Sequence, residues 1–221
     1  MKLQRLGGYA AFAGVLAYAA FVASAARYQP LSDWSDPAKM MAVLSAVPNK
    51  YYLTALLWII SNILFLPLMF ALRERMQANA PYITGAMLIS TSAAIAMAVA
   101  ESIINLKSVA MIVPQQDLSA FRAAWAVTQG LHWANGHAFA WALLLLGCAA
   151  LKTRAFSRIL AGLLLLTGIL WIPNVFFVQL GFTRLTLIYI ATSCISAIWC
   201  GIELLRQKQS QPAAKEMVAL Q

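Results

Sequence analysis

The chain has 221 residues, of which 62% are hydrophobic and only 10% are charged. A soluble domain carries roughly a quarter charged residues, so this composition excludes an ordinary soluble globular fold. The net charge of +9 does not indicate a nucleic-acid partner, because the basic residues lie between apolar blocks instead of gathering on one arm or face. The composition therefore predicts a polytopic membrane protein whose main partner is the lipid bilayer.

Six charge-free blocks divide the chain, and each is long enough to cross roughly 30 Å of hydrocarbon as a helix. A single segment in lipid must satisfy its own backbone hydrogen bonds, and these blocks lack the two-residue alternation of barrel strands. We therefore expect an all-α fold, with a bundle of six transmembrane helices over 1–206 and a disordered cytoplasmic tail over 207–221. The expected spans are Leu6–Ala26, Tyr51–Leu72, Tyr82–Ala100, Leu131–Leu151, Ile159–Thr183 and Leu185–Ile202.

The positions of Lys and Arg predict the orientation, because cytoplasmic loops retain an excess of positive charge. With the N-terminus inside, ten of the sixteen basic residues lie on the inner side of the membrane. The short segment from Lys152 to Arg158 alone holds three basic residues and no acidic one. Both termini are therefore expected in the cytoplasm, in a multi-pass protein of the cell inner membrane.

The first block has two interpretations. Two basic residues precede an apolar run that ends in Ala23, Ser24 and Ala25, which is a plausible signal-peptide cleavage site. Cleavage would leave five spans and an N-terminus outside. The run is longer than a usual signal core, however, and its three glycines suit close helix packing, so we favour a retained first span.

Two outer connections are too long for simple turns. The first begins with Asp36 and Pro37, a favourable N-cap and first helical residue. The second begins in the same way at Asp117 and can run straight into the fourth span. We expect both to be structural lids at headgroup level over the outer end of the bundle. Their apolar stripes are Met40, Met41, Leu44 and Val47 in the first, and Leu118, Phe121 and Trp125 in the second.

Polar side chains at membrane depth are costly, so those that persist are candidates for function. At about 1.5 Å per residue, Glu101 lies roughly 28 Å above the inner end of the third span, near the outer boundary. Polar residues of the fourth and fifth spans lie at a similar height, which predicts a water-filled vestibule open to the outer side. The candidate ligand-binding residues are Glu101, Asn105, His132, Trp133, Asn135, His137, Trp141 and Asn174.

The two histidines do not form a metal motif by themselves. His132 and His137 are five residues apart, which turns them about 140° from each other and excludes an i, i+4 metal pair or a bis-histidine haem. A metal ion bound by Glu101, one histidine and a further ligand is kept as an alternative. We expect no other cofactor. His137 lies four residues from both Trp133 and Trp141, a stripe that either lines a pocket for an aromatic or cationic ligand or belongs to an interfacial aromatic belt.

The chain has no motif for nucleophilic or metal-assisted catalysis, so we do not expect an enzyme. The middle span of each half nevertheless carries an amide and a proline, which removes a backbone donor. These are Asn62 and Pro67 in the second span, and Pro173 and Asn174 in the fifth. Pro67 and Pro173 are therefore candidate helix breaks, as in a small transporter built from two inverted three-helix repeats.

The segment between the fourth and fifth spans reads GCAALKTRAFSRILAGLLLLTGIL from Gly147. Its short basic loop and the run from Ser157 to Leu160 resemble a family of uncharacterised six-span bacterial membrane proteins, the domain of unknown function 4386. The N-terminal run from Arg5 to Tyr9 is also similar to that family's opening, so the resemblance covers most of the chain. Ala161 stands where the family usually has glycine. The resemblance implies the six-span fold and implies no activity.

These observations lead to one hypothesis and two alternatives. The hypothesis is a non-enzymatic membrane protein that binds or senses a small apolar or aromatic ligand in the outer vestibule. The first alternative is a small secondary transporter that uses the two broken spans. The second is a metal-dependent intramembrane enzyme.

Overall fold

The computed structural model describes residues 2–26, 36–178 and 183–206, without the side chains of 173–178 and 183–186. Within these ranges the chain is helical and contains no strand, which confirms the all-α prediction. The tail predicted over 207–221 lies outside the described residues. The elements are α1 (Lys2–Ala25), α2 (Pro37–Ala46), α3 (Pro48–Met76), α4 (Pro81–Met111), the short 3-10 helix η2 (Val113–Gln115), α5 (Leu118–Thr153), α6 (Arg158–Val178) and α7 (Thr183–Arg206).

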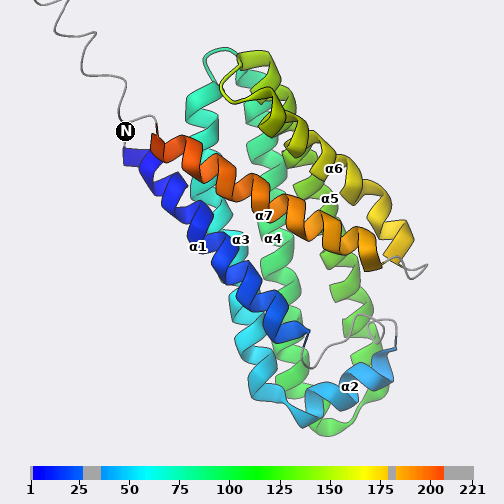
Figure 1. The fold of residues 1–221 in the computed structure, drawn as a ribbon. Coiled ribbons are helices and arrows are strands. Elements are labelled where there is room, and N and C mark those ends of the chain that lie inside the picture. The colour runs from blue at the N-terminus through cyan, green and yellow to red at the C-terminus, as the bar shows by residue number, and fades with distance from the viewer. Residues whose placement is uncertain (1, 27–35, 179–182, 207–221) are drawn as a thin grey trace, which may run out of the picture.

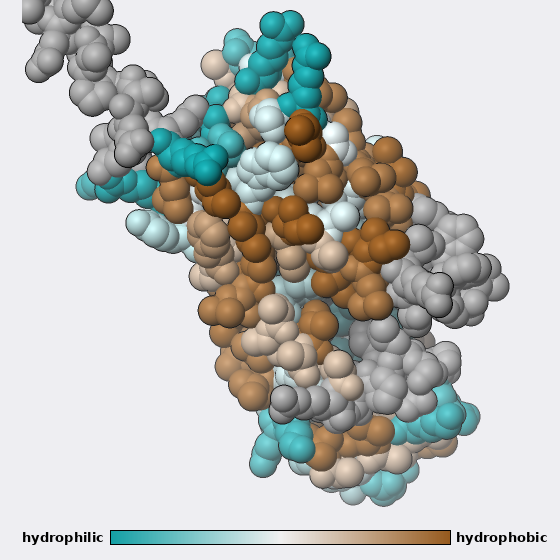
Figure 2. Space-filling view, in the orientation of Figure 1, coloured by the Kyte–Doolittle hydropathy of each residue, from teal (hydrophilic) through white to brown (hydrophobic). Residues whose placement is uncertain are grey.

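Five helical stretches of the described chain are long and apolar enough to cross a membrane. The described apolar part of α6 is shorter and covers Arg158–Ile172. On the face shown in Figure 2, hydrophilic residues gather toward the two ends of the molecule, and mostly hydrophobic residues cover the surface between them. This distribution is that of a multi-pass membrane protein, because the apolar band matches the hydrocarbon and the charges reach water. The five stretches are Lys2–Ala25, Pro48–Met76, Pro81–Gln115, Leu118–Thr153 and Leu187–Arg206.

The long helices form a closed ring. Helices α1, α3, α4, α5, α6 and α7 each pack against the next along the chain, and α7 returns to pack against α1 (Figure 1). The start of α1, the end of α7 and the α3–α4 and α5–α6 connections share one end of the ring, here called the termini end. The opposite end carries α2 and is called the α2 end.

Close backbone contacts hold α1 in the ring. A Cβ atom on Gly7 would overlap the side chain of Ala71 in α3, and one on Gly8 would lie 2.7 Å from Leu205 and 3.1 Å from the carbonyl oxygen of Gly201 in α7. Glycine permits this approach because it has no side chain to separate the helices. These contacts pack α1 against both α3 and α7.

Both predicted lids adopt the expected local structure. Asp36 Oδ1 accepts hydrogen bonds from the backbone N–H groups of Ala38 (3.0 Å) and Lys39 (3.2 Å), which caps α2. Asp117 Oδ1 accepts from the N–H of Ala120 (2.9 Å), and α5 then runs without interruption into the span. These caps confirm the two helix starts. The buried residues that join the lids are Met40, Met41, Leu44, Val109, Val113, Phe121 and Trp125.

The helix break predicted at Pro67 is wrong. Helix α3 continues through Pro67 from Pro48 to Met76, and α6 is also helical across Pro173, whose side chain lies outside the described residues. A proline removes one helical hydrogen bond, and the neighbouring turns and helices can hold the remaining ladder in place. A proline and an amide in one span were therefore insufficient evidence for an interrupted helix.

The termini end of the ring is closed by an apolar core and one arginine. The Arg75 guanidinium donates to the carbonyl oxygens of Ala155 (2.5 Å) and Glu203 (3.3 Å) and lies 4.2 Å from the ring centre of Phe156. These contacts join α3 to the α5–α6 connection and to α7. The core beneath Arg75 includes Leu68, Leu72, Leu146, Leu160, Leu164 and Leu204.

Candidate functional site

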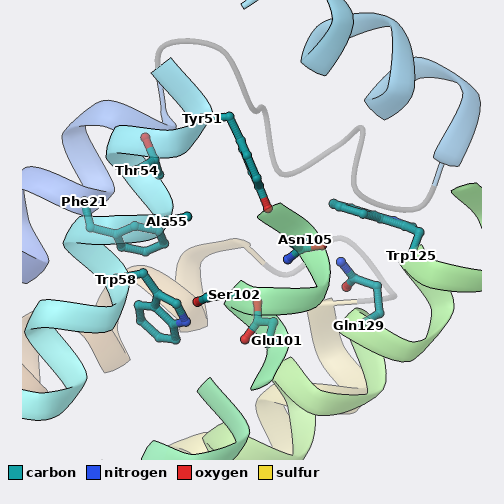
Figure 3. Close-up of a pocket in the computed structure, with 10 residues that line it drawn as sticks. All are labelled: Phe21, Tyr51, Thr54, Ala55, Trp58, Glu101, Ser102, Asn105, Trp125 and Gln129. Carbon is teal, nitrogen blue, oxygen red and sulfur yellow. The ribbon is translucent and has the colours of Figure 1, made fainter. Parts of the chain in front are cut away.

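A pocket lies inside the ring at the α2 end, between α1, α3, α4 and α5 (Figure 3). It measures about 450 Å³ with its open mouth included, and the space between the side chains admits a few water molecules. We call it the vestibule pocket. Of its ten described lining residues, four are aromatic, one is acidic and none is basic. The lining residues are Phe21, Tyr51, Thr54, Ala55, Trp58, Glu101, Ser102, Asn105, Trp125 and Gln129.

Glu101 is the charged group of the vestibule pocket, and it is 9% exposed. Its Oε1 accepts a hydrogen bond from His132 Nδ1 at 3.2 Å. Its Oε2 is buried and has no hydrogen-bond partner among the described residues. A buried acceptor without a partner costs on the order of 1–3 kcal/mol, and more when it is charged. The second oxygen therefore has an unused capacity to accept a hydrogen bond from a molecule in the pocket.

Trp58 forms the wall next to Glu101. Its ring centre lies 4.8 Å from that of Phe21 and 5.9 Å from that of His132. Its Nε1–H is buried and donates to no described group. The vestibule pocket thus contains an unused donor on α3 as well as an unused acceptor on the neighbouring helix α4.

Some of the other polar groups in the lining already form hydrogen bonds within the protein. The Ser102 hydroxyl donates to the carbonyl oxygen of Ala98 one turn earlier (2.8 Å), and the hydroxyls of Thr54 and Ser24 lie 2.7 Å apart. Asn105 of α4 and Gln129 of α5 face each other across the pocket (Figure 3). These two amides add neutral donors and acceptors near the mouth.

A second cavity, the central chamber, follows the vestibule pocket along α3, and Trp58 lines both. It measures about 520 Å³ including its opening. The Asn135 side chain donates to the carbonyl oxygen of Ala94 (2.7 Å), and the Nε1–H of Trp171 has no partner among the described residues. Tyr18, Ser61, Asn62, Phe65, Gly136, Phe139, Tyr189 and Ser193 complete its lining. A third cavity lies further along α3, next to Leu68 and Leu72, and its lining is mostly apolar.

The structure brings together part of the predicted site. Glu101 and Asn105 line the vestibule pocket, and His132 lies behind Glu101 and binds it. Asn135 lies in the central chamber, and the Trp133 ring centre is 6.3 Å from that of Trp171, another residue of its wall. The sequence placed these residues at one depth in the membrane. In the structure they are divided between two adjoining cavities.

The other predicted residues do not join the site. The Nδ1–H of His137 donates to the carbonyl oxygen of Trp133 (3.0 Å), a local bond within α5. Trp141 is 54% exposed, and neither residue lines a cavity described above. The stripe that includes them is therefore not a pocket wall, because the chamber faces another side of α5. The side chain of Asn174 lies outside the described residues.

Sequence reasoning missed Trp58, Phe21, Tyr51 and Gln129. Trp58 had a usable signal, since it lies one turn before the intramembrane Asn62 and about 15 Å from the start of α3, away from the usual aromatic belt. The other three carry no such signal, because single aromatic and amide residues near helix ends are common. Their importance arises from the way α1, α3 and α5 converge on Glu101.

Within the described ranges, no three His, Cys, Asp or Glu side chains come together in a way that could hold a metal ion. Protein-family models, curated proteins and solved structures give no match to this chain. The chemistry of the cavities therefore provides the evidence for a function.

Proposed function

We propose that this chain is a six-span membrane protein of the inner membrane, with both termini in the cytoplasm, that binds or senses a small ligand in the vestibule pocket. The ligand enters from the outer side. The observation that carries the proposal is the buried Oε2 of Glu101, which has no hydrogen-bond partner among the described residues and belongs to a pocket near the α2 end. A polar group of this kind marks a place where a ligand can supply the missing hydrogen bond.

Positive charge supports this orientation. Arg73, Arg75, Arg154 and Arg158 lie at the termini end, where an excess of basic residues indicates the cytoplasm. Ser157 Oγ accepts from the backbone N–H of Leu160 (3.2 Å), so the serine-arginine-isoleucine-leucine run begins α6. That local structure is consistent with the resemblance to the family of unknown function, which we retain as part of the proposal.

The form of the ring favours binding over transport. Polar side chains line the cavities from the α2 end to the middle of α3, and the apolar core and Arg75 close the termini end. Among the described residues, the cavities change from polar near the α2 end to mostly apolar in the third cavity, so a polar ligand is held nearer the α2 end. The uninterrupted α3 also removes the main support for two broken helices, so a transporter is not proposed as the function.

The test uses purified protein in nanodiscs and a panel of small solutes that are neutral, anionic or cationic. Thermal unfolding is followed by intrinsic tryptophan fluorescence. We expect at least one solute class to raise the unfolding temperature of the wild type and to leave that of Ala55→Phe unchanged, because Ala55 is a buried lining residue and phenylalanine would fill the pocket. The proposal is overturned if no class stabilises the wild type, or if Ala55→Phe responds equally.

A further inference from the structure

We propose that the vestibule pocket selects a small protonated amine, whose ammonium group binds Oε2 of Glu101 while its carbon atoms lie against the aromatic walls. This inference rests on the proposed function and adds the chemical class of the ligand. It changes the expectation of a purely apolar or aromatic ligand, because the structure places an acidic group in the same pocket as the aromatic side chains and next to Trp58 (Figure 3).

The charge of the lining selects against anions and for cations. Among the described residues that line the pocket, Glu101 is the acidic one and none is a Lys or Arg. His132 is the basic group in contact with it, and it binds Oε1 and leaves Oε2 available. An N–H group that carries a positive charge forms a hydrogen bond to a carboxylate roughly twice as strong as a neutral pair does. An anion at the same place would meet the carboxylate at close range.

The aromatic walls suit the same ligand. The faces of tryptophan, tyrosine and phenylalanine rings attract cations, and they also bury alkyl carbons. The unpaired Nε1–H of Trp58 adds a donor for an oxygen atom of the ligand. A quaternary ammonium would use the rings but could not donate to Oε2, so the site favours an amine that keeps its N–H groups. The aromatic lining residues are Phe21, Tyr51, Trp58 and Trp125.

The size of the pocket limits the ligand. The space between the side chains admits only a few water molecules, so the ligand has only a few heavy atoms. Small side-chain rotations bring the buried Oε2 of Glu101 and Nε1 of Trp58 into contact with it. Ethanolamine meets these requirements, since its ammonium group can bind Glu101 and its hydroxyl oxygen can accept from Trp58. It is used here as a probe of the chemical class.

Basic residues around the mouth do not reverse this preference. Lys39, Lys50, Lys107 and Arg122 are all exposed. At physiological ionic strength, solvent-exposed charges are largely screened beyond about 8 Å, whereas the buried carboxylate acts at contact distance. The measurements are therefore made at about 0.15 M salt, with potassium chloride added to keep the ionic strength equal in every sample.

The experiment compares three probes of similar size and different charge: ethanolamine, ethylene glycol and glycolate. Binding to wild-type protein in nanodiscs is measured by tryptophan fluorescence titration and by the shift in unfolding temperature. Two wall residues, Trp58 and Trp125, are themselves tryptophans. We expect ethanolamine to bind at least tenfold more tightly than ethylene glycol, and glycolate to show no saturable change.

Three variants identify the group that provides the selectivity. Glu101→Gln keeps the shape of the side chain and removes its charge, so ethanolamine should bind at least tenfold more weakly. Glu74→Gln is the matched control, because Glu74 is exposed at the other end of α3. His132→Gln keeps a donor for Oε1 and cannot carry a positive charge, so it should bind ethanolamine at least as well as the wild type.

The outcomes separate the two proposals. If ethylene glycol binds as tightly as ethanolamine, or if Glu101→Gln binds ethanolamine unchanged, the amine inference is overturned and the pocket remains a ligand site. If none of the three probes binds, the amine inference is also overturned. The solute panel and the Ala55→Phe variant then decide independently whether the pocket binds ligands at all.

Discussion

The indole of Trp171 in α6 lies directly against the backbone of Gly136 in α5. A Cβ atom at position 136 would overlap Nε1 and two carbon atoms of the ring. Both residues line the central chamber, so the missing side chain of Gly136 creates the space that Trp171 occupies. The contact joins α5 to α6 and keeps the indole at the chamber wall.

Replacement of Gly136 by alanine should therefore destabilise the protein. The added methyl group must push Trp171 toward the chamber, and such overpacking typically costs about 1–3 kcal/mol. Gly162→Ala is the matched control, because no atom lies within 4 Å of the Cβ position there. The control should be neutral or more stable by up to about 1 kcal/mol, since alanine favours a helix over glycine. Equal unfolding temperatures for the two variants would contradict the contact between Gly136 and Trp171.

The second prediction concerns the first helix. Gly7→Ala should lower the unfolding temperature, because its Cβ would overlap Ala71 and lie 3.0 Å from the carbonyl oxygen of Pro67. Gly85→Ala, with open space around the same position in α4, should not lower it. The measurement is thermal unfolding in nanodiscs, with intact mass spectrometry to verify that α1 is present. A purified protein that has lost α1 and still folds would disprove the structural role of this helix.

Arg75 provides the third prediction. Arg75→Gln removes the charged donor from the carbonyl oxygens of Ala155 and Glu203 and loses the contact with the Phe156 ring. Hydrogen bonds from charged groups contribute about 1.5–3 kcal/mol, so stability should fall by this order. The α5–α6 connection should also become more sensitive to limited proteolysis. Arg158→Gln replaces an exposed arginine at the same end and should have little effect on either property. If the two variants behave alike, Arg75 does not hold this end together.

The fourth prediction tests the orientation in the membrane. Gln116 is exposed at the α2 end, and Asn79 is exposed in the α3–α4 connection at the termini end. In intact cells, a membrane-impermeant thiol reagent should label Gln116→Cys and should label Asn79→Cys only after the membrane is opened. The unmodified protein, which has three cysteines, provides the background signal. The reverse labelling pattern would invert the orientation.

Local rules predicted the starts of α2 and α5. Asp36 and Asp117 could be identified as helix caps because a cap depends on a few neighbouring residues. Glu101 and His132 could be identified as candidates because ionisable groups are rare in an apolar span. That they bind each other could not be predicted, since 31 positions separate them and the pairing depends on how α4 and α5 pack.

By itself the sequence determined that the chain is a helical membrane protein and that a few polar residues lie within its spans, because burial in hydrocarbon restricts composition and secondary structure so strongly. Only the tertiary structure decided that the helices close into a ring, that Pro67 leaves α3 unbroken, and that Trp58 faces Glu101. The physical reason is that periodicity defines a helix and its length but not its rotation against a neighbour. In this ring, close contacts at residues such as Gly7 and Gly136 set that rotation and so decide which side chains share a pocket.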